Sequence, residues 1–216
     1  MAQRPGAQKW VPTGAGLDAL REAAAGCEGC ELHVAATQTV FSTGSALARV
    51  ALVGEQPGDA EDRQGAPFVG PAGQLLNRAL DAAGLDRADC YVTNAVKHFR
   101  FTATPKRRLH QTPELVHLQA CRPWLTAELA VVDPEIVVCL GATAARSLLG
   151  PEFRVTRQRG ILFPRATQAP DPAMVQSGWL MATIHPSAVL RAPDRDDTFA
   201  GLVRDLVVAA EALVPS

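Results

Sequence analysis

One stretch, residues 50–73 (VALVGEQPGDAEDRQGAPFVGPAG), constrains the fold more than any other part of the chain. It begins with a short apolar run, Val50 to Val53, which is typical of a buried strand. A loop rich in glycine, proline and acidic residues follows, and an amphipathic helix begins near Ala72. Open α/β sheets bind their ligands in loops at the carboxyl ends of strands. We therefore expect this loop to line a functional site.

The alternation of apolar strands and amphipathic helices continues along the chain and predicts an α/β fold. Strands are predicted at residues 90–96, 136–140 and 179–184, and helices at 17–25, 72–83, 113–132, 142–149 and 197–213. Residues 97–110 and 151–178 are expected to be irregular, with a hairpin strand at 160–163. Such an order implies parallel strands with right-handed crossovers. The prediction is a three-layer α/β/α sandwich with a central, mainly parallel four-stranded sheet, in which residues 1–15 form a flexible lead-in and residues 16–216 a single domain.

Composition narrows the class of protein. The chain has 216 residues and a net charge of −1, so affinity for nucleic acid requires a local basic patch. Its first residues lack the apolar core of a signal peptide, and no apolar run reaches the length of a membrane span, about 18 residues. We expect a cytoplasmic monomer without a membrane partner. The five cysteines then indicate metal binding, catalysis or plain burial.

Polar side chains follow three of the predicted strands, and they are expected to meet at one edge of the sheet. Glu55 and Gln56 follow the first strand, Asn94 ends the second, and His185 with Ser187 follows the last. An asparagine amide offers both a donor and an acceptor, which matches the O4 and N3–H edge of uracil and opposes that of cytosine. Phe68 supplies a ring face for stacking, although it is also compatible with a core position.

Two further patterns have both functional and ordinary explanations. Cys27 and Cys30 form a CxxC pair that could hold zinc or an iron–sulfur cluster equally well. Cys121 and His98 are the candidates for the remaining ligands. Cys90 and Cys139 lie in apolar runs, where a cysteine acts as a small hydrophobic residue.

Residues 97–113 contain five Lys or Arg, two His and no acid. This segment is suited to phosphate contacts, and its alternative is a solvated loop.

Taken together, the motifs resemble the uracil-DNA glycosylase superfamily, specifically its family-four iron–sulfur branch. The motifs that support the resemblance are CEGC at 27–30, GEQPGDAEDRQGAPFVGPAGQLL at 54–76, TNAVK at 93–97, ACRPWL at 120–125, GATAARSLLG at 141–150 and HPS at 185–187. The resemblance implies an α/β/α fold, a [4Fe-4S] cluster and recognition of uracil flipped out of DNA, with single-stranded DNA preferred.

The sequence departs from family four at three places, and two of them point to the UdgX group within that branch. His98 stands where family four has a cysteine, so the implied cluster ligands are Cys27, Cys30, His98 and Cys121. Residues 106–110 (KRRLH) resemble the KRRIH loop of the UdgX group, and Gln56 replaces the alanine common in family four. That group is known for a covalent bond to uracil-containing DNA through the loop histidine.

The resemblance implies a role for each candidate residue. Phe68, Asn94 and Gly54 would bind the base, and His185 would donate to uracil O2. His110 would attack C1′ as a neutral nucleophile, with Glu55 accepting its proton and Gln56 positioning the base or water. Lys106, Arg107 and Arg108 would hold the loop and nearby phosphates, and Ser187 is a further candidate for phosphate. Asp59 would contact the residues of the site and not the base itself. The alternatives are a turnover glycosylase that releases abasic DNA, a non-catalytic binder of damaged or single-stranded DNA, and a zinc-stapled domain with a small-molecule ligand.

Overall fold

The computed structural model describes residues 5–165 and 178–213. Within them, six strands form one sheet in the order β1-β3-β2-β6-β8-β7. The central strands β3 (Cys90–Asn94), β2 (Val50–Gly54), β6 (Ile136–Leu140) and β8 (Trp179–Thr183) are parallel. Two short antiparallel strands, β1 (Ser42–Thr43) and β7 (Phe163–Pro164), extend the edges. The predicted three-layer α/β/α sandwich is therefore confirmed, although the sheet gains two edge strands too short to show a sequence period.

The central strands are buried on both faces, and alternate residues supply two separate cores. Ala51 and Val53 pack into one apolar cluster, whereas Val50 and Leu52 pack into the other. Because side chains alternate across a strand, a continuous apolar run serves both layers of helices. This is why these strands contain no polar residue until their carboxyl ends.

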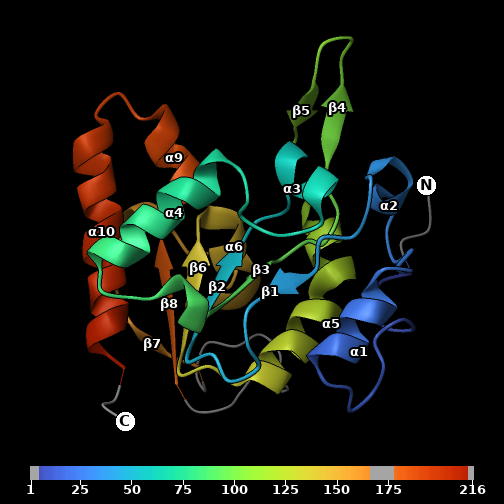
Figure 1. The fold of residues 1–216 in the computed structure, drawn as a ribbon, viewed down its shortest axis with the longest axis horizontal. Coiled ribbons are helices and arrows are strands. Elements are labelled where there is room, and N and C mark those ends of the chain that lie inside the picture. The colour runs from blue at the N-terminus through green and yellow to red at the C-terminus, as the bar shows by residue number, and fades with distance from the viewer. Residues whose placement is uncertain (1–4, 166–177, 214–216) are drawn as a thin grey trace.

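Helices cover both faces, as Figure 1 shows. Helices α1 (Leu17–Ala24), α5 (Leu115–Val132) and α6 (Ala142–Leu149) pack on one face, and α4 (Pro71–Ala82), α9 (Pro186–Arg191) and α10 (Arg195–Glu211) on the other. Shorter turns, α2 (Leu32–Ala35), α7 (Val155–Gln158) and the 3₁₀ helix η1 (Arg87–Asp89), lie in the connections. Helix α5 begins two residues after the predicted Pro113, because the main-chain N–H of Glu114 donates to His117 Nδ1 (2.9 Å) and caps it there. In the described ranges, no helix combines the length and apolarity needed to cross a membrane.

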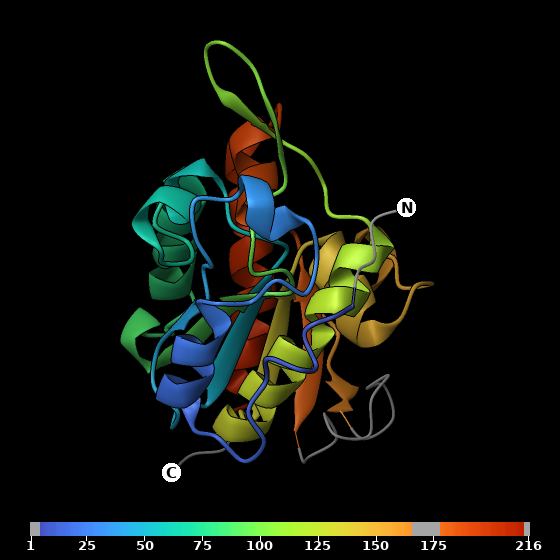
Figure 2. The same ribbon diagram turned by 90° about the vertical axis from the view of Figure 1, so that its right-hand side faces the viewer.

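A helix and a hairpin beside the cavity form where only loops were expected. Helix α3 (Asp59–Gln64) forms inside the first loop, and strands β4 (Phe101–Ala103) and β5 (Arg108–His110) pair as a hairpin inside the basic segment. Figure 2 shows this hairpin projecting from the body of the molecule. The predicted strand at 160–163 corresponds to β7, shifted toward the carboxyl end, and part of the segment around it (166–177) lies outside the described residues.

The first described residues are attached to the body of the protein. The N–H of Gly6 donates to the carbonyl of Gly29 (3.0 Å), and that of Ala7 donates to the carbonyl of Ala120 (2.8 Å). Ala7 is buried. This part of the expected lead-in therefore links the CxxC segment to helix α5.

Candidate active site

The polar residues at the strand ends line a single cavity of about 600 Å³. Its floor comes from the carboxyl ends of the parallel strands, and its walls come from the hairpin, α6 and α9. The sequence-predicted residues on its surface are Glu55, Gln56, Phe68, Asn94, His110, His185 and Ser187. The topological rule that placed them at one edge thus brings together side chains up to 132 positions apart (55 to 187).

One end of the cavity fits a flat, polar-edged ring. Asn94 is 2% exposed, and none of the described residues donates a hydrogen bond to its Oδ1. A Cβ at Gly54 would lie 2.3 Å from that oxygen and 2.7 Å from Phe68 Cζ, so only glycine leaves room there. A buried acceptor without a donor costs free energy, about 1–3 kcal/mol, until a ligand supplies one.

Phe68 forms the apolar wall of this end in a strained conformation. Its φ is +56°, a region that bulky residues rarely adopt. A Cβ at Gly73 would lie 1.7 Å from the Phe68 carbonyl oxygen, so the following helix packs too closely for any side chain there. The phenyl ring stacks against the imidazole of His185, with centroids 5.8 Å apart.

Glu61 holds the loop that presents this ring. Its carboxylate is buried and accepts hydrogen bonds from the N–H of Gly58 (3.1 Å) and of Gly70 (2.9 Å). The two ends of the loop are thereby fixed by one side chain.

The protonation of His185 follows from its contacts. Its Nδ1 accepts a hydrogen bond from the main-chain N–H of Ser187 (3.1 Å) and lies 2.8 Å from the Ser187 hydroxyl. Since Nδ1 is an acceptor, the neutral ring carries its proton on Nε2. Burial, together with the charges of Arg191 and His110, lowers the pKa of His185 to about 4. The Ser187 hydroxyl thus helps to orient this histidine, and its contact with phosphate stays a prediction.

His110 and Glu55 face each other across the other end of the cavity. Their Nε2 and Oε1 atoms are 3.4 Å apart, and about half of the His110 side chain is exposed. The hydroxyl of Thr143, on α6, donates to Glu55 Oε2 and leaves Oε1 directed at the imidazole. A nucleophile beside an oriented proton acceptor is an arrangement used for covalent catalysis.

Gln56 holds the base of the hairpin. Its Nε2 donates to the carbonyls of Arg100 and Gln111 (both 3.1 Å), and its Oε1 accepts from the Arg100 N–H (3.1 Å). The amide therefore joins the two strands of the hairpin at its base and ties them to the end of β2. Gln56 fixes the part of the hairpin that carries His110. Its Oε1 retains a second lone pair at the cavity surface, and the predicted contact with the base or water stays a prediction.

Arg108 also binds side chains of the protein itself. Its guanidinium pairs with Asp59 and with Asp62 (2.6 Å) and lies over the rings of Phe99 and Phe101. The hydrogen bond from Arg63, together with the guanidinium of Arg108, holds the pKa of Asp59 below its usual value. Arg108 therefore joins the hairpin to α3 through Asp59 and Asp62, as expected of a residue that holds the loop, and its contact with phosphate stays a prediction.

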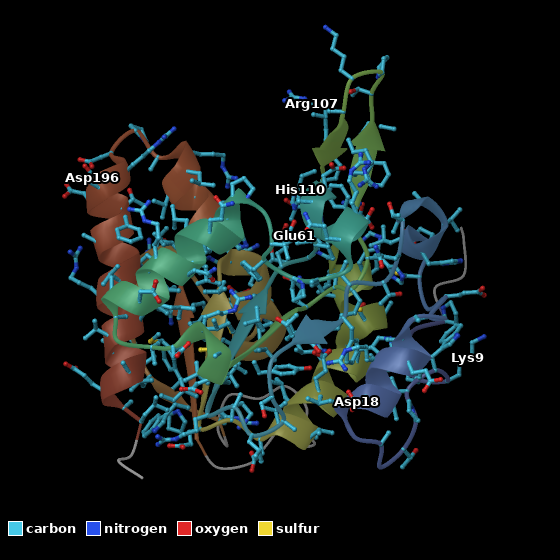
Figure 3. The ribbon with its side chains drawn as sticks, viewed as in Figure 1. Lys9, Asp18, Glu61, Arg107, His110 and Asp196 are labelled. Atoms are coloured by element: carbon cyan, nitrogen blue, oxygen red, sulfur yellow. The ribbon has the colours of Figure 1, made fainter. Side chains whose placement is uncertain are left out.

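Lys106 and Arg107 remain at the exposed turn of the hairpin. In Figure 3, Arg107 lies far out along the hairpin, and His110 lies at its base above Glu61. The turn is closed by the Thr104 N–H, which donates to the Arg107 carbonyl (3.0 Å). The two cations are therefore held away from the cavity but on the same side of the molecule.

Comparison with known proteins identifies the family to which this chain belongs. The family model described as "Uracil DNA glycosylase superfamily" matches residues 41–207. The chain belongs to the uracil-DNA glycosylase superfamily. It is similar to the type-4 uracil-DNA glycosylase of Pyrobaculum aerophilum, with 36% identity over 177 residues, covering 82% of this chain and 86% of that protein. The corresponding protein of Thermotoga maritima is 34% identical over 177 residues, covering 81% and 83%.

The candidate metal ligands of this glycosylase-superfamily chain lie in the protein interior. Cys27, Cys30, Cys121 and His98 are all buried. The main-chain N–H of Lys97 donates to Cys121 Sγ (3.3 Å), and the indole N–H of Trp124 donates to Cys27 Sγ (3.2 Å). Burial, with smaller contributions from the charges of Cys30 and Cys27, raises the pKa of Cys121 to about 12. Hydrogen bonds to sulfur are typical of iron–sulfur sites.

The tautomer of His98 also fits metal binding. The Thr39 hydroxyl donates to the Ala24 carbonyl (2.9 Å), and the same oxygen lies 2.9 Å from His98 Nε2. Since that hydroxyl proton is already used, Nε2 must carry the imidazole proton. The lone pair of the ring is then on Nδ1, the atom available to a metal. Burial, with a smaller contribution from His33, lowers the pKa of His98 to about 4.

These residues do not form a site for one metal ion. Across 5–165 and 178–213, no three His, Cys, Asp or Glu side chains are close enough together to hold one metal ion. The zinc and the iron–sulfur alternatives for these residues therefore both stay predictions.

Some residues of the glycosylase site were missed from sequence. Thr143 and Arg191 line the cavity, and Gly141 has a φ of +92° with space for no Cβ, which would lie 2.9 Å from His185 Cβ. Gly141 and Thr143 closely follow the strand predicted at 136–140, so the rule used for the other strand ends also applied here. Arg191 gave no such signal, because α9 was not predicted.

Proposed function

We propose that this protein excises uracil from DNA. The observation that carries the proposal is the buried, unpartnered Oδ1 of Asn94, beside a stacking ring and opposite a neutral histidine. An acceptor and a donor on one amide complement N3–H and O4 of uracil, whereas cytosine presents the reverse pattern. The type-4 relatives support the same activity by their names.

The base would enter by flipping out of the strand, since its N-glycosidic bond is otherwise inaccessible. Phe68 stacks on the ring, and Gly54 leaves the space that the ring edge needs. The Nε2–H of His185 donates to O2 as negative charge develops on the leaving uracil. A neutral imidazole fixed in place costs no reorganisation at that moment, which is the basis of electrostatic stabilisation.

We further propose that His110 captures the sugar, as in the UdgX group. The electron pair of the C1′–N1 bond leaves with uracil as its anion. A ring nitrogen of neutral His110 donates its lone pair to C1′, and the resulting imidazolium loses its remaining N–H proton to Glu55. The N–C1′ bond has no good leaving group, so each molecule reacts once. Support comes from the short approach of Glu55 to His110 and from the Gln56 and Arg108 contacts that hold the hairpin over the cavity.

The proposed substrate is single-stranded DNA. A single strand needs no base pair broken before the nucleotide flips, and the projecting hairpin offers Lys106 and Arg107 to its phosphates. Competition between single- and double-stranded oligonucleotides of the same sequence measures this preference.

Replacing His110 by serine tests the capture step. Wild-type protein incubated with an end-labelled single strand containing one uracil is expected to give a band that stays shifted after boiling in denaturant. His110→Ser is expected to give no such band and to release uracil over many turnovers, leaving alkali-labile abasic DNA. Gln111→Ser, at an exposed neighbouring position, is the matched control and should retain the adduct.

The same gel separates the alternatives. Wild type that leaves abasic DNA without a shifted band would contradict capture and leave a turnover glycosylase. Salt-sensitive binding without uracil release would favour the non-catalytic DNA binder.

We also propose that Cys27, Cys30, Cys121 and His98 hold a [4Fe-4S] cluster with a structural role. When bound, the cluster would supply cross-links between the CxxC segment, α5 and the start of the basic segment. None of these four residues is among those that line the cavity.

Cys27→Ala is expected to lose most of its iron and its absorbance near 400 nm (about the range of iron–sulfur clusters). Its unfolding temperature should fall by about 10 °C, since metal-binding energy contributes to folding. Cys139→Ala is the control, because Cys139 is equally buried but lies within β6. A colourless Cys27→Ala protein as stable as wild type would show that the cluster is not structural.

A further inference from the structure

The arginines near the cavity differ in whether a carboxylate of the protein already pairs with their positive charge. The guanidinium of Arg108 pairs with Asp59 and Asp62. That of Arg100 pairs with Glu114 and donates to the Thr112 carbonyl. Neither charge is available to an anion outside the protein without breaking contacts that hold the hairpin.

Arg191 differs from both of these arginines. It is exposed, it lines the cavity, and no described residue forms an ion pair or hydrogen bond with its side chain. Its charge reaches the interior of the site, since it contributes to lowering the pKa of His185. A cation left unpaired at the mouth of a cavity, where neighbouring arginines are paired, is suited to an anionic ligand.

Its position relative to the hairpin suggests which anion. Arg191 ends α9, whereas His110 and Thr112 line the cavity from the hairpin side. Figure 1 shows α9 and the hairpin at the same end of the molecule, with the α4 end and α3 between them. A strand whose nucleotide enters the cavity must leave its backbone at the mouth, so it would run between these two walls.

We propose that Arg191 binds the phosphodiester next to the flipped nucleotide, on the wall opposite the hairpin cations Lys106 and Arg107. The inference rests on the proposed function and identifies where that function's substrate contacts the protein. Arginine suits this role because its planar guanidinium binds a phosphate through two parallel hydrogen bonds.

The test measures binding to single-stranded oligonucleotides that carry one 2′-fluorinated deoxyuridine, since the fluorine slows glycosidic cleavage. Three versions are compared: all phosphates charged, an uncharged methylphosphonate 5′ to the uridine, and the same substitution 3′ to it. For wild type, one of the two substitutions is expected to weaken binding about tenfold, the loss of one charge-assisted contact.

Arg191→Gln is expected to bind the charged strand about tenfold more weakly and to be insensitive to that same methylphosphonate. The slope of log affinity against log salt should fall by about 0.7. Arg191→Lys should recover part of the affinity. Arg195→Gln removes an exposed cation outside the cavity and should keep the wild-type sensitivity.

If Arg191→Gln and wild type lose the same affinity with each methylphosphonate, the inference is wrong. Binding of Arg191→Gln at wild-type strength to the charged strand would also overturn it. Uracil release from an unmodified strand by wild type is measured in parallel. Failure of that release would contradict the proposed function, while the methylphosphonate comparison would still report whether Arg191 contacts the backbone.

Discussion

Gly54→Ala is expected to lower the rate of uracil excision by about 10²-fold or more, the scale of a misplacement of about 1 Å in an active site. The added methyl carbon would lie 2.3 Å from Asn94 Oδ1 and 2.7 Å from Phe68 Cζ. Both atoms belong to side chains that must stay fixed to hold the base, so either shift removes a contact with uracil. Single-turnover excision at saturating enzyme measures the effect.

The matched control is Gly26→Ala. A Cβ at Gly26 would have its nearest neighbour at 4.0 Å, and the residue lies far from the cavity. Its excision rate should match wild type. If Gly54→Ala excised uracil at the wild-type rate, the base would have to bind elsewhere in the cavity.

Lys97→Met is expected to lower the free energy of unfolding by about 3–5 kcal/mol, because it leaves a buried carboxylate without its cation. Lys97 and Glu128 form an ion pair whose side chains are 1% and 0% exposed. The ammonium also donates to Thr93 Oγ1 (2.6 Å) and to the Asn94 carbonyl (2.9 Å), so it stabilises the strand end that presents the base-reading amide. Urea unfolding at matched iron content measures the loss.

The double variant Lys97→Met, Glu128→Gln separates charge from packing. A glutamine removes the unpaired charge and still accepts the hydrogen bond that the Tyr91 hydroxyl donates to this side chain in wild type (2.8 Å). Most of the lost stability should return, since replacing a whole buried pair costs far less than breaking it. A double variant as unstable as the single one would attribute the loss to the methionine instead.

Local sequence signals predicted the elements that form the sandwich. The strand at 136–140 and the helix at 142–149 have the predicted bounds, because a β-branched apolar run and an alanine-rich helix meet at Gly141. The cavity residues were also accessible from sequence, since a polar residue after a buried parallel strand must lie at the carboxyl edge of the sheet. Helix α3 and the hairpin were missed because charged, polar segments of this kind lack an apolar period.

Only the tertiary structure decided what several of these side chains contact. Gln56 reads as a site residue in sequence, yet its amide is bound by the main chain 44 and 55 positions away. The sequence predicts that Arg108 holds the loop and nearby phosphates. In the structure its guanidinium pairs with the carboxylates of Asp59 and Asp62, which lie 49 and 46 positions away in the chain. Residue type and position along a strand determine where a side chain lies. Its partner depends on which segments the fold brings within about 3 Å, the length of a hydrogen bond, and no local pattern contains that information.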